Sequence, residues 1–315
     1  MIDFISATKC LDKDSPNLSN CNWISSNVVG WDRYEIIGQK PMKVLWKPMG
    51  GLLKVEGSIP YFLQGHNFSF DVGGYVEAIG YLQELLGVGL WDACLNEFEH
   101  GVVFPVEGKP ADYIRYHSSL LSSRLKECIN GNDGGSGKWW KGDFADLKIY
   151  DPKVNLHHKV GMKQRMGIAG YDPDLRYLKF EAHYKKPHLL NQGVSLSVED
   201  LQCPERLAML NDMLLSQYQL LHPMKTLIKP TDKGELKYQE LITRQLVEVL
   251  MNQGMSIQDA KKEVFRFMDG FDILSTKDKD NRKAMARKIF NGLKESEVSQ
   301  WDLTAKIEQA LASEN

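Results

Sequence analysis

The sequence is poor in cysteine, in net charge and in long apolar runs, and each shortage excludes a class of protein. Its five cysteines among 315 residues are scattered and form no CxxC pair, which argues against a disulfide framework and a cysteine-ligated zinc site. The formal net charge of −2 restricts any nucleic-acid site to a local patch. No apolar run approaches the roughly twenty residues that span a bilayer, and the start MIDFISATKC lacks a signal-peptide pattern. We therefore expect a soluble cytoplasmic protein with no membrane partner.

Strand-like and helix-like runs alternate over the first 190 residues. KVLWKPMGGLLKVEG predicts a hairpin around Gly50 and Gly51, and VGGYVEAIGYLQELLG predicts a helix that stops at Gly87. KPADYIRYHSSLLSSRLKECING predicts a second helix, whereas LWDACLNEF, DLKIY and LRYLKFEAHY predict strands. This order predicts an α+β fold, in which helices cover one face of an antiparallel sheet.

The character of the sequence changes near residue 190. Residues 191–232 contain a predicted helix that begins at Pro204 and then a linker with two prolines. Residues 233–315 contain three or four predicted helices, one of them with Ser256 and Asp259 in capping positions and Gly270 at its end. We therefore predict a catalytic domain at 1–190, a helix and linker at 191–232 and a small helical domain at 233–315.

Two predicted strands carry carboxylates where β-propensity disfavours them. In LRYLKFEAHY, a period of two puts Lys179, Glu181 and His183 on one face and the apolar residues on the other. In LWDACLNEF, Asp92 interrupts an otherwise apolar run, and Glu56 lies late in a third strand. A hard divalent cation held by carboxylates from neighbouring strands would compensate these charges. A solvated face with cross-strand ion pairs is the alternative.

Tyr150 ends the strand DLKIY between two patches of basic and aromatic residues. GKWWKGD sets Trp139 and Trp140 between lysines, and LHHKVGMKQR is a run of cations. Such alternation suits a nucleic-acid strand, with phosphates on the cations and bases on the rings. For the tyrosine alone, a half-buried structural ring is the alternative.

The stretch YFLQGHNFSFD crowds Gln64, Gly65, His66 and Asn67 between two apolar runs. One interpretation is a turn in which Gly65 supplies a positive φ and the polar residues lie in water. The other is a loop that grips a ligand.

Together these motifs resemble the gene II family of filamentous-phage replication initiators, which includes phage and plasmid relatives. The family's LQGHN is intact at 63–67 and follows a VE at 55–56, and its RFEA strand is matched by KFEA at 179–182 with Lys185 beyond it. Its RID strand is matched by LWD, which keeps Asp92, and the opening MID agrees. The similarity covers the first 190 residues.

The resemblance implies a nickase-like sheet and an enzyme that nicks and rejoins one strand at a replication origin to start rolling-circle replication. It implies Tyr150 as the nucleophile that forms a 5′-phosphotyrosine, and Lys153 as a charge that lowers its pKa. It implies Mg²⁺ or Mn²⁺ on Asp92 and Glu181, with Glu56 as a third ligand. The implied partners are single-stranded and duplex origin DNA and the host helicase and polymerase. Gln64, Lys179 and Lys185 are expected DNA contacts, and His66 and Asn67 either contact DNA or support the metal site. The pattern of basic and aromatic residues adds Trp139 and Trp140 as DNA contacts.

Other interpretations stay open at this point. The chain can be an origin-binding protein without catalytic activity, or a metal-dependent nuclease that uses water while Tyr150 is structural. Tyr113 and Tyr116 in DYIRYH are alternative nucleophiles, unless they pack one helix face. In the C-terminal helices, the basic residues of DNRKAMARKIF predict either a surface for duplex phosphates or an ordinary solvated helix side.

Overall fold

The computed structural model describes residues 1–11, 15–25, 28–118, 125–128, 137–185, 195–223, 238–270, 275–291 and 302–313. The chain divides into two compact units. The first comprises Met1–Arg115, Arg124–Leu220 and Thr304–Asn315, and the second comprises Tyr116–Ser123 and Leu221–Leu303. These divisions differ from the predicted boundaries, chiefly because the end of the chain belongs with its beginning.

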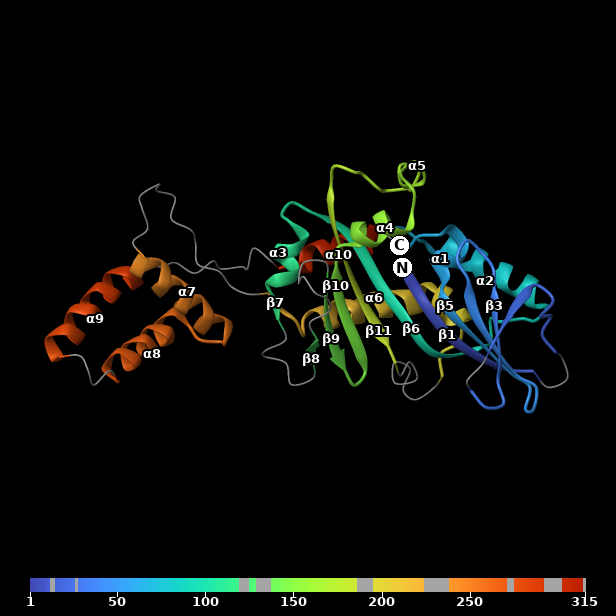
Figure 1. Ribbon diagram of the computed structural model, residues 1–315, viewed down its shortest axis with the longest axis horizontal. Helices are drawn as coiled ribbons and strands as arrows, with labels where there is room; N and C mark the ends of the chain where they lie inside the picture. Colours follow the sequence, from blue (N-terminus) through green and yellow to red (C-terminus); the bar gives the residue numbers. More distant parts are fainter. Residues whose placement is uncertain are drawn as a thin grey trace. The chain divides into compact units, whose positions relative to one another are not determined.

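A ten-stranded antiparallel sheet forms the centre of the first unit (Figure 1). In spatial order its strands are β2 (Cys21–Ile24), β3 (Asp32–Ile36), β4 (Met42–Lys47), β5 (Leu52–Ser58), β1 (Ile2–Cys10), β6 (Cys94–Val106), β11 (Arg176–Tyr184), β10 (Ala145–Tyr150), β9 (Gly137–Gly142) and β8 (Leu125–Cys128). The predicted α+β class with an antiparallel sheet is confirmed, as is the hairpin around Gly50 and Gly51, which both have positive φ. The amino-terminal strand β1 lies inside the sheet, between β5 and β6.

Helices cover both faces of this sheet rather than one. They are α1 (Ile59–Gln64), α2 (Val72–Leu86), α3 (Pro110–Arg115), α4 (Pro152–Lys159), α5 (Met162–Arg165), the 3-10 helix η2 (Glu199–Gln202), α6 (Pro204–Tyr218) and α10 (Thr304–Ser313). Leu156 of α4 packs with Tyr177 of β11, whereas Tyr218 of α6 packs edge-on against Phe180 of the same strand. Because residues 177 and 180 point to opposite faces of a strand, α4 and α6 lie on opposite sides.

Two predicted elements are shorter than expected. The helix expected from residue 109 to 131 is only α3, and Leu125–Cys128 form the edge strand β8. Residues 119–124 of this expected helix lie outside the described residues. The strand expected from Leu90 begins only at Cys94, after a turn that contains Trp91 and Asp92.

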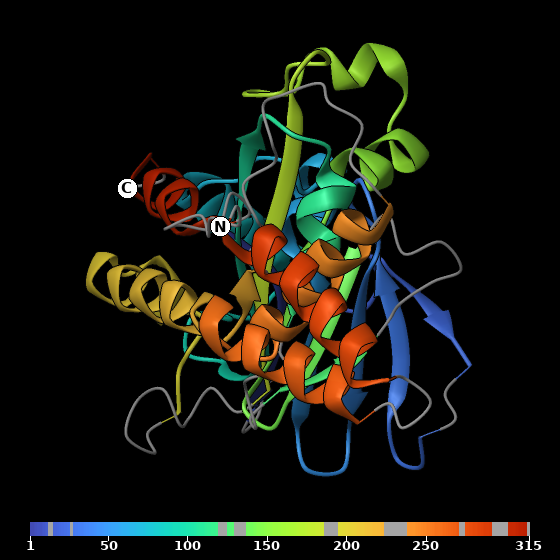
Figure 2. The ribbon, with the colours of Figure 1, turned by 90° about the vertical axis from the view of Figure 1, so that its left-hand side faces the viewer.

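The second unit contains the short strands β7 (His117–Ser118) and β12 (His222–Pro223) and the helices α7 (Tyr238–Asn252), α8 (Ile257–Asp269) and α9 (Thr276–Asn291). Figure 2 shows these helices in orange, packed together. Their shared core consists of Val247, Met251, Ala260, Val264, Ala286 and Phe290. Ser256 caps α8 as expected, since its Oγ accepts a hydrogen bond from the Asp259 N–H at 3.1 Å.

The last predicted helix, α10, belongs to the first unit. It contacts β6 and α6, and its apolar residues Ile307 and Leu311 are buried. Among the described helices, none has the length and apolar character needed to cross a lipid bilayer.

Candidate active site

The predicted alternation of β11 holds, but its polar face is buried. Lys179 is fully buried and Glu181 is 3 % exposed, so the interpretation as a solvated face is wrong. Burying charges is costly unless each is paired and hydrogen-bonded. Their partners come from each other, from the adjacent strand β10, and from β1, which lies beyond β6 on the other side.

Tyr150 and Glu181 meet across two paired strands. Lys148 lies opposite Glu181 and Tyr150 opposite Lys179 in the β10–β11 register. The Tyr150 hydroxyl donates a hydrogen bond to Glu181 Oε2 at 2.9 Å. Lys148 Nζ donates to the other oxygen, Oε1, at 3.2 Å, and to Glu99 Oε1 at 2.6 Å. The Glu181 carboxylate is thus held at one oxygen by a phenol and at the other by an ammonium group.

Lys179 supplies a second, completely buried positive charge. Its Nζ pairs with Glu181 Oε2 at 3.1 Å and with Asp3 Oδ2, and lies 5.9 Å from the centre of the Tyr150 ring. Burial lowers the pKa of Lys179, but the charges of Asp3, Tyr150 and Glu181 outweigh it and hold that pKa well above its usual value. Burial and the Glu181 charge raise the pKa of Tyr150 well above 10.0. The resting site therefore contains a protonated phenol and a charged lysine.

Asp3 enters the site through an irregularity in β1. The register of β1 against β6 shifts between Ile2 and Phe4, and such bulges redirect side chains. Asn67 Nδ2 donates to Asp3 Oδ2 at 2.6 Å, and Ser58 Oγ donates to Asp3 Oδ1 at 2.8 Å. The LQGHN loop is therefore more than a turn: Asn67 fixes a carboxylate of the site.

His183 connects the site to two glutamates of β6. Its Nδ1 lies 3.0 Å from Glu99 Oε1 and its Nε2 lies 3.0 Å from Glu97 Oε2. Burial lowers the pKa of His183, but these hydrogen bonds raise it above 6.5. For Glu99, burial alone would raise the pKa, but the contacts with His183 and Lys148 outweigh burial and hold the pKa at about 2. Glu99 is consequently charged near neutral pH, and its contact with His183 favours the charged form of that histidine.

Two glycines leave room for the side chains of Tyr150 and Glu181. Gly101 lies opposite Glu181 in the sheet, and a Cβ there would be 2.5 Å from the Glu181 Cβ. Gly137 lies opposite Tyr150, and a Cβ there would be 2.9 Å from the Tyr150 Cβ. Side chains at these positions would push the tyrosine and the glutamate out of place.

One group of carboxylates can hold a divalent cation. Asp3, Glu99 and Glu181 each offer an oxygen, and these atoms lie within 4.8 Å of one another. Oxygen ligands of this kind suit Mg²⁺ or Mn²⁺. Lys148 and Lys179 already neutralise the same carboxylates, so a cation must compete with two ammonium groups.

The structure corrects two of the three predicted metal ligands. Asp92 lies in the turn before β6 with its side chain 73 % exposed, and pairs with Lys9 at 2.5 Å. Glu56 lies on β5 and pairs with Lys43 at 3.1 Å and Lys54 at 2.9 Å. Neither joins the carboxylate group around Glu181. Lysine side chains compensate their charges.

Lys153 is also displaced from its predicted role. Pro152 starts α4 directly after the strand, and Lys153 Nζ then donates to the carbonyls of Pro173 at 2.6 Å and Leu175 at 2.8 Å. The same Nζ lies 5.5 Å from the centre of the Tyr171 ring and 5.9 Å from that of Tyr177, so its contacts among the described residues do not include the Tyr150 hydroxyl. Lys179 occupies the place beside the phenol. The alternative nucleophile Tyr113 is buried on α3.

Several of the predicted DNA contacts lie in the protein interior. Lys179 and Trp140 are fully buried, which rules out direct DNA contact. Lys185 Nζ is held by the Gly142 carbonyl at 2.7 Å and by Asp146 at 2.8 Å. Trp139 is half-buried opposite Lys148, and the Nζ of that lysine lies 5.5 Å from the centre of the indole ring. Of the two tryptophans, only Trp139 can present part of its ring beside the site.

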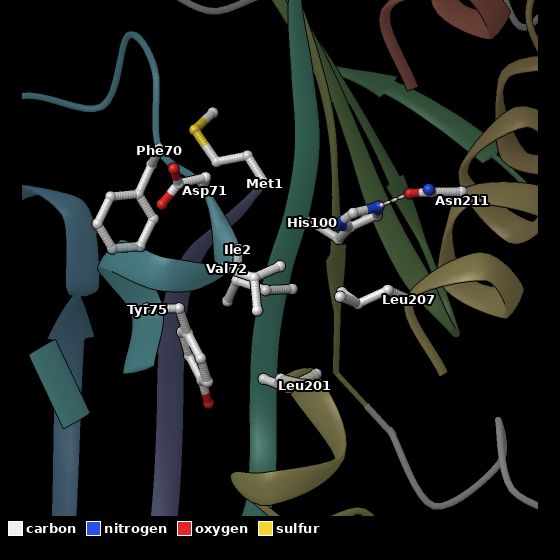
Figure 3. A pocket seen from close by; sticks show the side chains of 10 residues that line it. All are labelled: Met1, Ile2, Phe70, Asp71, Val72, Tyr75, His100, Leu201, Leu207 and Asn211. Atoms are coloured by element: carbon white, nitrogen blue, oxygen red, sulfur yellow. Dashed lines mark hydrogen bonds between the residues drawn. The ribbon is translucent and has the colours of Figure 1, made fainter. Parts of the chain in front are cut away.

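The opposite face of β6 carries a different polar group. His100 lines a cavity of about 30 Å³ near Met1, enough for a water molecule, and Figure 3 shows its ring pointing at Asn211. The two side chains are 2.8 Å apart. Burial and the amino terminus lower the pKa of His100 to about 3, so this histidine is neutral near pH 7, whereas the pKa of His183 is raised.

The sequence interpretation missed Asp3, Glu99 and Lys148. Lys148 carried a signal, because a period of two places it on the same face of β10 as Tyr150. Asp3 is a carboxylate between the apolar residues Ile2 and Phe4 of a strand, the same signal that was applied to Asp92. Glu99 alternates with Glu97 on β6, but only strand order shows that it lies beside Glu181.

Comparisons with known proteins give no further identification: no family model matches the chain, and no curated protein matches it.

Proposed function

We propose that the protein nicks and rejoins a single DNA strand at a replication origin, through a covalent bond between Tyr150 and a 5′-phosphate, and so initiates rolling-circle replication. The observation that supports this most directly is the hydrogen bond from the Tyr150 hydroxyl to the buried Glu181 carboxylate. A nucleophile that contacts a base, which is itself oriented by a third group, is the usual arrangement in covalent catalysis. Here Lys148 and Lys179 orient the carboxylate.

In the proposed reaction, Glu181 accepts the phenolic proton as the Tyr150 oxygen attacks phosphorus. A P–O bond to tyrosine forms while the bond to the 3′ oxygen breaks, and that oxygen takes up the proton that Glu181 received. Lys148, which is partly exposed, stabilises the negative charge that develops on the phosphoryl oxygens, and the buried Lys179 keeps Glu181 in position. The tyrosine is thereby activated without a lowered resting pKa.

The same geometry favours rejoining. The phosphotyrosine keeps the energy of the phosphodiester, because one P–O bond replaces another. A free 3′ hydroxyl can attack it, and Glu181 then accepts the proton of that hydroxyl and returns one to Tyr150. This reversibility distinguishes the proposal from hydrolysis by a nuclease that uses water.

Asp3, Glu99 and Glu181 would hold Mg²⁺ or Mn²⁺ in this scheme. When bound, the cation would polarise the scissile phosphate. Asn67 and Ser58 keep Asp3 in position for this role. Single-stranded and duplex origin DNA are the proposed substrates, and the host helicase and polymerase the proposed partners in replication.

The function is tested by incubating the protein with labelled single-stranded DNA that contains its own replication origin, in Mg²⁺ or Mn²⁺. The proposal predicts DNA that remains linked to protein on a denaturing gel and that is released by a protease. A water-using nuclease would leave free ends only, and an origin-binding protein without catalytic activity would leave the DNA intact. Either of these outcomes would contradict the proposal.

A further inference from the structure

A second cavity, of about 310 Å³, lies beside the LQGHN loop. Its walls come from the turn between β3 and β4, from the loop after α1, and from the segment that includes α5. Val160 and Ile168 form its apolar part, and both belong to a buried cluster with Phe68. The cavity therefore has a fixed hydrophobic side supported by the packing of the first unit.

The remaining walls carry polar side chains that contact no partner among the residues that the structure describes. Gln39, Lys40 and Gln164 line the cavity, and within the described residues none of these side chains makes a hydrogen bond or an ion pair. Together they offer two amides, each with donors and an acceptor, and one ammonium group. No aspartate or glutamate is among the described residues that line the cavity, so an anionic ligand meets no repulsion there.

His66 adds an imidazole ring beside the fixed amide of Gln64. Gln64 Nε2 donates to the carbonyls of His66 at 3.2 Å and Ser69 at 2.5 Å, which fixes the orientation of the amide. The same nitrogen lies 3.3 Å from His66 Nδ1. Because the two N–H groups of this amide already donate to carbonyls, the contact does not select a tautomer, and the neutral ring of His66 offers one donor and one acceptor nitrogen. Burial lowers the pKa of His66, which keeps the ring neutral.

An apolar wall, amide groups and a neutral ring N–H match the chemistry of a nucleobase. A base has a flat apolar surface and an edge of alternating donors and acceptors, which glutamine side chains can pair in a bidentate manner. Lys40 is available for the phosphate attached to such a nucleotide. The ligand class that fits the whole lining is therefore an unpaired nucleotide.

The cavity and the site around Tyr150 share two structural elements. Asn67, which follows His66, holds Asp3, and Val160 ends the helix that begins directly after Tyr150. We propose that the cavity binds one unpaired base of the strand that Tyr150 attacks, and so sets the preferred base near the nick. This inference rests on the proposed function for its place in the reaction.

The test measures binding rather than cleavage, with the full chain carrying Tyr150→Phe so that no covalent bond forms. The probes are labelled thymine strands of about twelve nucleotides, in which one central base is thymine, adenine, guanine or cytosine. Fluorescence anisotropy should show a preference of at least about fivefold for one of these bases, as expected for a bidentate contact. The double variant Gln39→Ala/Gln164→Ala should lose this preference.

The control is the double variant Gln219→Ala/Lys109→Ala. It changes two exposed residues that do not line the cavity, and it should keep the preference. Equal binding of all four probes, or a preference that survives Gln39→Ala/Gln164→Ala, would overturn the inference. Because the readout is equilibrium binding, its result is separate from the covalent reaction. A protein that forms no adduct but loses base preference in the cavity variant would refute the nicking proposal and keep the cavity as a base site.

Discussion

At the scale of single residues, the site is a row of alternating charges that runs from Asp3 to Glu97, and the neutral amide of Asn67 is bound to Asp3 at one end. Asp3, Glu181 and Glu99 are separated by Lys179 and Lys148, and His183 continues the row to Glu97. Each carboxylate touches at least one cation. The Tyr150 hydroxyl joins this row at Glu181, the one carboxylate that contacts both lysines.

Glu181→Gln tests the role of this carboxylate as a base. The amide keeps the size of the side chain but cannot accept the phenolic proton. We expect the single-turnover rate of adduct formation to fall about 100-fold or more, with DNA binding retained. Glu97→Gln is the control, because Glu97 contacts His183 and not Tyr150. An unchanged rate for Glu181→Gln would assign proton removal to another group.

Lys179→Met tests whether the buried lysine stabilises the fold. Methionine fills similar space but leaves Asp3 and Glu181 without their shared cation. Breaking a buried pair costs about 3–5 kcal/mol of unfolding free energy, which urea denaturation can measure. Lys43→Met removes a partly exposed partner of Glu56 and should cost about 1 kcal/mol or less. Equal losses for the two variants would show that Lys179 contributes no more than a surface charge.

At the scale of elements, the faces and ends of individual strands were easier to predict than which strands lie side by side in the sheet. The alternation in LRYLKFEAHY identified both faces of β11, and DLKIY ended at Tyr150 as the structure has it. The position of β1 between β5 and β6, and its irregular register near Asp3, are long-range features that local pattern does not encode. Asp92 was wrongly assigned to the site for a local reason. The sequence of the turn that precedes β6 resembles that of the strand itself.

The two histidines on the faces of β6 and β11 predict opposite pH effects on stability. His183 has a raised pKa, so its stabilising contribution is complete below 6.5 and is lost as the pH rises through the raised value. His100 has a pKa of about 3, so stability falls as the pH drops from 6.5, where the unfolded histidine takes up a proton. We therefore expect the unfolding free energy to be largest between the acidic range, where protonation of His100 in the unfolded chain destabilises the fold, and the alkaline range, or alkaline limb, where the contribution of His183 is lost.

Urea denaturation of His183→Gln at about pH 6 and about pH 9 checks the alkaline limb. The variant should lose more unfolding free energy at the lower pH, where the wild-type imidazole is charged and paired with Glu99. His158→Gln, at an exposed position of α4, is the control and should show no such difference. A loss for His183→Gln that is independent of pH would mean that the charge on His183 does not stabilise the fold.

At the scale of the whole molecule, the chain returns to its starting unit after the helices α7 to α9. Caps and periodicity correctly predicted α8 and α10 as helices, but not that α10 packs on β6. The buried residues Ile307 and Leu311 have the same amphipathic spacing in either arrangement, so sequence pattern alone could not assign the helix to a unit. The C-terminal residues are therefore part of the sheet unit's core.

The helix α9 carries six lysine or arginine residues and two aspartates, and we propose that it binds duplex phosphates near the origin. Lys283 is paired with Asp269, so the exposed Arg287 and Lys288 are the better contacts. Arg287→Glu/Lys288→Glu should weaken duplex binding and flatten its salt dependence, measured by titration at several salt concentrations. Lys262→Glu/Arg266→Glu on α8 is the charge-matched control. Equal weakening by both variants would indicate a general charge effect.

The most direct test of the proposed reaction is whether the variant Tyr150→Phe still forms a covalent adduct with DNA. This change removes one oxygen and its hydrogen bond to Glu181, while the aromatic ring can still pack beside Lys179. The protein should bind origin single strands about as tightly as wild type, yet give no protein-linked DNA on a denaturing gel in Mg²⁺ or Mn²⁺. Wild-type protein should give the adduct in parallel. An adduct that persists in Tyr150→Phe would contradict the central claim and place the nucleophile on another residue.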